Sequence, residues 1–151
     1  MLDSALKEVY TKFKLHFYKS VFGRIQNREL SLTAVETFCI EIIYAMDNPT
    51  VSEFAAFIQI SSPNAAYKVN SLIKKGYLRK VQSENDKREF HLEVTEKYLD
   101  YYNISNSYVD EVVNRIKKRF DGKELELLEE VLKITAVDLM PELNEIENIK
   151  V

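Results

Sequence analysis

Residues 51 to 95 constrain the fold of this chain more than any other segment. Their pattern predicts a short helix over Val51–Ile58. The turn Gln59–Pro63 separates it from a second helix, which runs from about Asn64 to Lys75 and ends at Gly76, because glycine commonly follows the last helical residue. Two short helices joined by a tight turn are typical of a helix-turn-helix.

A basic β-hairpin is predicted directly after the second helix. Its strands are Tyr77–Gln82 and Glu89–Thr95, and the polar segment Ser83–Arg88 forms its tip. The order of helix, turn, helix and hairpin is that of a winged helix-turn-helix, which places its second helix, the recognition helix, in the major groove of DNA. This segment therefore predicts double-stranded DNA as a partner.

The distribution of charge supports this prediction, although the net charge of the chain is −3. Residues 60–92 carry seven Lys or Arg and three Asp or Glu, a local charge of about +4. Residues 121–151 carry nine acidic and three basic residues, a local charge of about −6. Such polarity would orient the molecule on a polyanion. Random scatter of surface charge is the alternative. The charge distribution therefore supports DNA binding only together with the helix-turn-helix pattern.

Further helices are predicted on both sides of this segment, because apolar residues recur there at three- and four-residue steps. Their expected ranges are Asp3 to about Phe22, Ser31 to Met46, Thr95 to Phe120, and Lys123 to Met140. In the second of these helices, Thr33 and Glu36 have the spacing of a capping box. The expected core side of that helix comprises Val35, Phe38, Cys39, Ile42, Ile43 and Met46.

The first and last helices are too apolar to be solitary surface elements. We expect them to pack together and against a second copy of the chain, so that residues 1–30 and 96–151 form a helical dimerisation region. Residues 31–95 form the DNA-binding region of the same compact protomer. The expected fold is mainly α-helical, with a small β-hairpin wing and with dimerisation helices at both ends. Closure of a monomeric core by these helices is the alternative.

Three short motifs add information that periodicity does not contain. Leu72–Leu78 has the form Leu-x-x-Lys-Gly followed by two hydrophobic residues, and Ser83–Thr95 has Asp-x-Arg before an alternating strand. Leu32–Phe38 has the form Leu-Thr-x-x-Glu-x-Phe. In this order and spacing the motifs resemble those of the MarR family of bacterial transcriptional regulators. The resemblance implies a sequence-specific regulator, and we expect a repressor, that binds a palindromic operator as a homodimer.

The chain departs from the family's pattern at three places. Ala66-Tyr67-Lys68 stands where family members often carry an Arg, Val94 replaces a common Leu, and Tyr98 stands where a Gly is usual. These differences concern the operator sequence and the local geometry rather than the fold.

The predicted DNA-binding residues lie on the recognition helix and on the wing tip. Helical spacing turns Ala65, Val69 and Leu72 inward and turns polar side chains outward, where amides and hydroxyls can contact base edges or phosphates. In the family, the Arg at the position of Arg88 reaches into the minor groove and the Asp at the position of Asp86 braces it. A solvated polar face is the alternative interpretation. The full predicted set is Ser61, Ser62, Asn64, Ala66, Tyr67, Lys68, Asn70, Lys74, Lys75, Asp86, Lys87 and Arg88.

Aromatic residues indicate where a ligand would bind. The resemblance implies a cleft between the dimerisation helices and the DNA-binding region, which in the family often takes small aromatic or lipophilic compounds. The residues predicted to line it are Phe13, His16, Phe17, Phe38 and Tyr44. Packing of these side chains in the core is the alternative.

Enzymatic, metal and redox functions have no support in the sequence. It contains no glycine-rich phosphate loop, nucleophile elbow or plausible triad, so we expect neither an enzyme nor a cofactor. The two histidines, His16 and His91, lie on distant elements, and we expect a structural role for His91 in its wing strand. The single cysteine, Cys39, falls on an apolar helix side and predicts core packing rather than redox sensing.

Localisation and the remaining alternative function follow from the same observations. No membrane span or signal peptide is expected, and the single cysteine cannot form an internal disulfide, which together favour the cytoplasm. The competing hypothesis is a winged-helix module for protein contacts without specific DNA binding. Salt-dependent DNA binding separates the two.

Overall fold

The computed structural model describes residues 1–26 and 31–151. Residues 27–30, part of the predicted dimerisation region, lie outside the described residues, as do the side chains of Tyr101, Tyr102 and Ser105. The helices are α1 Leu2–Gln26, α2 Ala34–Ala45, α3 Val51–Ile58, α4 Ser62–Lys74, α5 Glu96–Tyr102, α6 Ile104–Arg119, α7 Gly122–Asp138 and the 3-10 helix η1 Pro141–Leu143. The strands are β1 Leu78–Gln82 and β2 Phe90–Val94. The predicted fold class, mainly α-helical with a β-hairpin wing, is confirmed.

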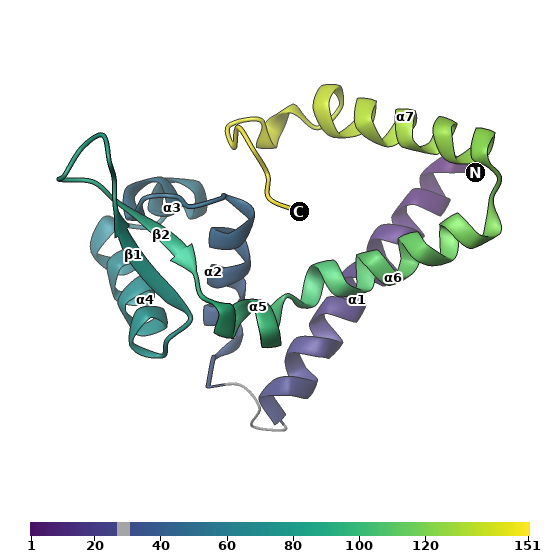
Figure 1. The fold of residues 1–151 in the computed structure, drawn as a ribbon. Helices are drawn as coiled ribbons and strands as arrows, with labels where there is room; N and C mark the ends of the chain where they lie inside the picture. The colour runs from purple at the N-terminus through teal and green to yellow at the C-terminus, as the bar shows by residue number, and fades with distance from the viewer. Residues whose placement is uncertain (27–30) are drawn as a thin grey trace.

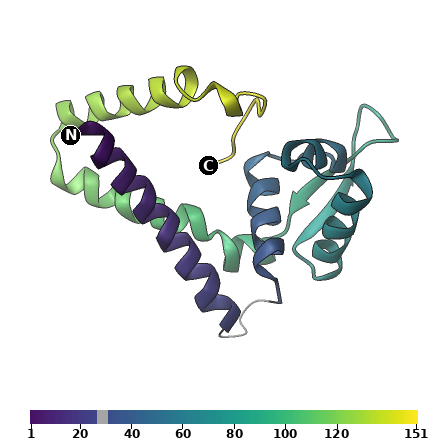
Figure 2. The same cartoon turned by 180° about the vertical axis from the view of Figure 1, so that it is seen from behind.

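Two parts of the molecule lie at opposite ends in Figure 1. Helices α2, α3 and α4 and the β1–β2 hairpin form one end, and α1, α6 and α7 form the other, with α5 between them. The hairpin is antiparallel, with Leu78 opposite Val94, and its tip points away from the helices of the other end. Seen from behind, α1 crosses α6 while α7 runs separately above them (Figure 2).

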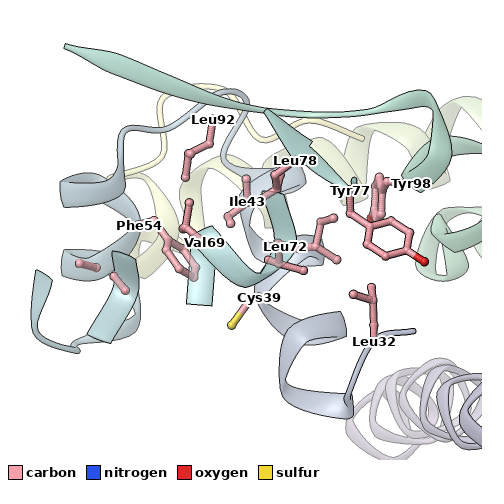
Figure 3. Close-up of a cluster of buried hydrophobic side chains, with 13 residues drawn as sticks. Leu32, Cys39, Ile43, Phe54, Val69, Leu72, Tyr77, Leu78, Leu92 and Tyr98 are labelled. Carbon is pink, nitrogen blue, oxygen red and sulfur yellow. The ribbon is translucent and has the colours of Figure 1, made fainter. Parts of the chain in front are cut away.

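The hydrophobic core lies among α2, α3, α4, the β1–β2 hairpin and α5, mostly within the predicted DNA-binding region. Val69 and Leu72 of α4 are fully buried and face Ile43 of α2 and Phe54 of α3 (Figure 3). Leu92 of the wing closes this core from the other side. Burial of each such side chain contributes about 1.5–3 kcal/mol to folding. The core therefore holds the recognition helix α4 and the base of the wing in one body.

The start of α2 is confirmed, but its predicted core side is partly wrong. Val35 and Phe38 are 52% and 39% exposed, whereas Thr37 and Ile40, which were not predicted, are fully buried. The Thr37 hydroxyl donates a hydrogen bond of 3.0 Å to the carbonyl of Thr33, so a polar residue is satisfied inside the core. The buried face therefore includes Thr37 and Ile40 and is rotated relative to the predicted one.

Two predicted helix boundaries are also wrong. Helix α1 continues through Gly23 to Gln26, since an isolated glycine costs a helix only about 1 kcal/mol. The single helix predicted from Thr95 to Phe120 is divided into α5 and α6 at Asn103, whose φ of −73° and ψ of 64° are not helical. Neither glycine nor proline marks this break. Ile104, the next residue, is buried, so the break turns the chain where an apolar side chain enters the interior.

Helix α7 has apolar side chains that remain largely exposed in the described part of the protomer. It leaves α6 at Asp121, whose carboxylate and Glu124 form a capping box, and the two helices open as a V in Figure 1. The exposed apolar residues of α7, between 36% and 64% exposed, are Leu127, Leu128, Val131, Leu132, Ile134 and Val137. In the described part of the chain, no helix is long and apolar enough to span a membrane.

Candidate DNA-binding surface

The recognition helix α4 begins with a side-chain cap. The Ser61 hydroxyl accepts a hydrogen bond of 3.3 Å from the backbone N–H of Asn64, and Pro63 occupies the first turn. The turn before it depends on Gln59, which adopts a left-handed φ of 57° at the end of α3. These local features set the orientation of the first turn of α4, and the polar residues of its N-terminal half lie at the surface.

One side of α4 is polar and accessible, as predicted. Tyr67 is 76% exposed, and Ser61, Ser62, Asn64 and Asn70 are exposed as well. Ala66 and Lys68 are partly buried at the margin of this side, while Lys74 is exposed near the end of the helix. The opposite side, with Ala65 and Val69, is fully buried. The exposed side therefore presents amide, hydroxyl and phenol groups to any macromolecule that docks there.

The wing tip is held in a tight turn that leaves Arg88 exposed. The Asp86 carboxylate accepts a hydrogen bond of 2.9 Å from the backbone N–H of Arg88, and the Gln82 side chain donates one of 2.6 Å to the carbonyl of Lys87. The bracing by Asp86 thus acts on the backbone of Arg88, whereas the resemblance implied bracing of its side chain. The bond to Asp86 uses only the backbone of Arg88, so it leaves the donors of the guanidinium unused.

Lys75 was also predicted to bind DNA, but in the structure its ammonium group has partners within the chain. Its ammonium group donates hydrogen bonds to the carbonyl of Ser31 at 2.8 Å and to the two carboxylate oxygens of Glu36 at 3.0 and 2.8 Å. An ammonium group has three N–H donors, so all of them are engaged within the chain. Lys75 instead ties the end of α4 to the start of α2.

The three sequence motifs meet in the same part of the fold. Glu36 and Lys75, one from the first motif in the chain and one from the motif at the end of α4, form the ion pair just described. The hydroxyl of Thr95, which closes the wing motif, donates a hydrogen bond of 2.7 Å to the carbonyl of Gly76. Gly76 has a φ of 85°, a left-handed conformation that suits glycine at the end of a helix. The motifs thus fix α2, α4 and the wing relative to one another.

The environment of Glu36 makes this junction sensitive to acid. Burial raises the pKa of its carboxyl group, but hydrogen bonds from Lys75, Ser71 and the backbone N–H of Thr33, together with the Lys75 charge, outweigh burial and hold the pKa at about 2. Because this pKa lies below its ordinary value of 4.5, the ionised carboxylate stabilises the folded state above pH 4.5. That contribution is lost as the pH falls from 4.5 towards 2.

We expect Glu36→Gln to lower the free energy of unfolding by about 1–3 kcal/mol at pH 7. Glutamine keeps the capping geometry but not the charge that pairs with Lys75. The measurement is urea unfolding of both proteins between pH 7 and pH 2.5, and the difference between them should shrink below pH 4.5. A difference that stays constant over this range would show that the carboxylate charge does not contribute.

The predicted ligand residues do not form one cleft. Phe13 and His16 pack on Tyr108 of α6, with the rings of His16 and Tyr108 stacked at 3.6 Å, and Phe17 lies 5.9 Å from Phe38 between ring centres. Tyr44, by contrast, packs on Tyr98 at 5.5 Å. The prediction is therefore wrong for Tyr44, because the aromatic residues of α2 point to two different sides of the helix.

Two hollows remain beside α1. A cavity of about 150 Å³ is lined by Phe13, His16, Phe17, Ile104, Tyr108 and Val109. A more open hollow of about 380 Å³ is lined by Tyr10, Lys14, Phe17, Tyr18 and Phe38. In the part of the chain that the structure describes, no group of His, Cys, Asp or Glu side chains is arranged to hold a metal ion. Cys39 is buried in the core, and burial raises the pKa of its thiol.

A capped helix with an exposed polar side, a preceding helix at a tight turn and a basic hairpin together define a winged helix-turn-helix protein. Residues 32–90 match the family model described as MarR family, which spans α2 to the start of β2. The winged helix-turn-helix region of this chain is therefore a MarR family domain.

Solved structures with the same fold cover nearly the whole chain. Streptococcus pneumoniae FabT, in complex with DNA, is 19% identical with a TM-score of 0.60, and the match covers 92% of this chain and 97% of FabT. A MarR family protein from Bacillus stearothermophilus is 12% identical with a TM-score of 0.63, over 91% and 92% of the two chains. A transcriptional regulator of Thermotoga maritima is 18% identical with a TM-score of 0.59, over 90% and 92%. Among curated proteins, no match is found.

Proposed function

We propose that this protein is a cytoplasmic transcriptional repressor that binds a palindromic operator as a homodimer. The observation that carries the proposal is the pairing of an exposed polar side on α4 with an exposed arginine at the wing tip, both at the end of the molecule remote from α1, α6 and α7 (Figure 1). In a winged helix-turn-helix the first can enter a major groove while the second reaches the adjacent minor groove. The similar structure of FabT contains DNA, which supports a DNA partner for this fold.

The proposed homodimer is supported by the exposed apolar residues of the terminal helices. Val113 and Ile116 of α6 and Leu128 and Leu132 of α7 line an open apolar groove of about 420 Å³. The outer side of α7 is apolar too, so α7 needs partners on two sides. A second copy supplies the same surfaces under two-fold symmetry and places two recognition helices about 34 Å apart on one face of DNA.

A small aromatic or lipophilic ligand would bind beside α1 rather than near Tyr44. The cavity around His16 and Tyr108 is of a size that accommodates one aromatic ring. It lies between α1 and α6 of the dimerisation region, so an occupant there would affect the packing of those helices.

Base contacts and phosphate contacts should respond differently to mutation. We expect Asn64→Ala and Asn70→Ala to narrow the affinity gap between the operator and random DNA, because amides can bond base edges. We expect Lys68→Ala and Lys74→Ala to weaken binding to both DNAs and to reduce the slope of log affinity against log salt by about one per phosphate contact. The measurement is a salt titration of binding to random DNA and to a genomic fragment that the wild type enriches.

A matched control comes from Lys75, whose ammonium group is engaged within the chain. Lys75→Met should lower the stability of the fold but leave the salt slope of the remaining folded protein unchanged, since Lys75 is engaged with Glu36. Equal loss of affinity for both DNAs in the Asn variants would refute the major-groove assignment. Absence of salt-dependent DNA binding by the wild type would refute the function itself and favour a protein-interaction module.

A further inference from the structure

The loop between α2 and α3 has an unusual backbone. Asp47 and Asn48 are consecutive and both left-handed, with φ of 53° and 61°. Non-glycine residues reach this conformation at a cost of about 1–2 kcal/mol each, although Asp and Asn tolerate it best. A loop that adopts it twice in succession must be held in place by contacts from outside.

The wing supplies these contacts from one side. The backbone N–H of Leu92 donates a hydrogen bond of 2.8 Å to the carbonyl of Pro49, and His91 forms a β-bridge with Thr50. The His91 ring adds a side-chain bond, because its Nδ1 lies 2.9 Å from the carbonyl oxygen of Asn48. A carbonyl only accepts hydrogen bonds, so Nδ1 carries the hydrogen.

The C-terminal segment supplies contacts from the other side of the loop. The backbone N–H of Lys150 donates a hydrogen bond of 2.9 Å to the carbonyl of Ala45, and its ammonium group lies 3.5 Å from the carboxylate of Asp47. The loop is therefore held by the C-terminal segment as well as by the wing, and it can serve as an anchor for the wing.

The wing needs such an anchor because its outer half has little else to hold it. Leu78 and Leu92 attach its base to the core, but all residues of the tip from Glu84 to Arg88 are exposed. A two-stranded hairpin is only marginally stable alone. A tilt at the base of the hairpin displaces the tip more than any other part, and Arg88 lies at the tip.

We propose that His91 is a positioning residue for the DNA contact of the wing. By bonding the Asn48 carbonyl it fixes the angle of the hairpin relative to α4, so that Arg88 is presented to DNA together with the recognition helix. His91 itself does not touch DNA in this arrangement, since its ring faces the loop. The proposal deepens the proposed function and rests on it.

The test uses two substitutions that separate the hydrogen bond from the ring. His91→Phe keeps a ring but has no donor, whereas His91→Asn keeps a donor at the same distance along the side chain. We expect His91→Phe to lower operator affinity about tenfold in the dimer, which carries two such bonds, and His91→Asn to retain most of the affinity. Circular dichroism and thermal unfolding report whether both variants remain folded at the assay temperature.

The decisive measurement repeats these substitutions in an Arg88→Ala background. If His91 acts by positioning Arg88, His91→Phe should have no further effect on affinity there. The same loss in both backgrounds, or equal loss with His91→Asn and His91→Phe, would overturn the proposal. Wild-type affinity of His91→Phe, with Arg88→Ala still impaired, would overturn it while leaving the proposed function intact. Failure of the wild type to bind DNA would overturn both.

Discussion

Leu132→Glu should convert the protein to a monomer and lower its operator affinity by at least about 100-fold, because one DNA-binding region then has to bind without its linked partner. Leu132 lies in the middle of α7, is 56% exposed in the protomer and lines the groove with Val113 and Ile116 of α6. A charge at this position stays solvated in the monomer, so the fold should persist. In the dimer the same charge would be buried without a partner, which is strongly unfavourable.

Sedimentation at micromolar concentration tests this expectation together with DNA binding. The wild type should sediment at about twice the chain mass of 17.7 kDa and Leu132→Glu at the chain mass itself. Glu126→Gln is the matched control, since Glu126 is exposed and its helical neighbours at three- and four-residue steps include Lys123, Glu129 and Glu130. A Leu132→Glu protein that remains dimeric would place the interface elsewhere. A wild-type monomer would remove the basis for palindromic recognition.

Arg88→Ala should weaken operator binding by about 1–3 kcal/mol per subunit, which amounts to more than tenfold in a dimer. Arg88 is exposed at the wing tip, and its backbone N–H, which alanine retains, makes the bond to Asp86. The substitution therefore leaves no cavity and breaks no internal hydrogen bond of the tip. Stability should be unchanged within about 0.5 kcal/mol.

Arg79→Ala provides a control of the same chemistry in the same hairpin. The guanidinium of Arg79 binds the carboxylate of Glu93 through Nε at 3.0 Å and Nη2 at 2.7 Å, so it is engaged within the wing. Its loss should change operator affinity much less than the loss of Arg88. Affinities are compared at moderate salt for wild type and both variants. Equal affinity of Arg88→Ala and the wild type would mean that the wing does not contact DNA.

Some residues that matter for the site could have been found in the sequence but were not. Thr50 and Glu53 form a capping box at the start of α3, with bonds of 2.8 and 3.1 Å, and their spacing is the same as that of Thr33 and Glu36. The role inferred for His91 had no such signal, because its partner is a backbone carbonyl 43 residues away. The sequence predicted a wing strand and a structural role for His91, but it did not indicate this partner.

The sequence by itself determined the features that depend on near neighbours. The capping box of Thr33, the bounds of α3 and the pairing of the wing strands all rest on interactions within a few residues or on the period of one element. The burial of Ala65, Val69 and Leu72 follows from helical period in the same way.

Only the tertiary structure decided which distant partner a given side chain contacts. In the sequence Lys75 resembles the other lysines near the end of α4. In the structure its ammonium group pairs with the carboxylate of Glu36, 39 residues away. Tyr44 is as aromatic as Phe38, but the side of α2 on which it lies brings it to Tyr98 instead of α1. The helix break at Asn103 likewise depends on where Ile104 is buried. Periodicity and motif spacing describe one element at a time, whereas these outcomes depend on the free energy of packing between elements.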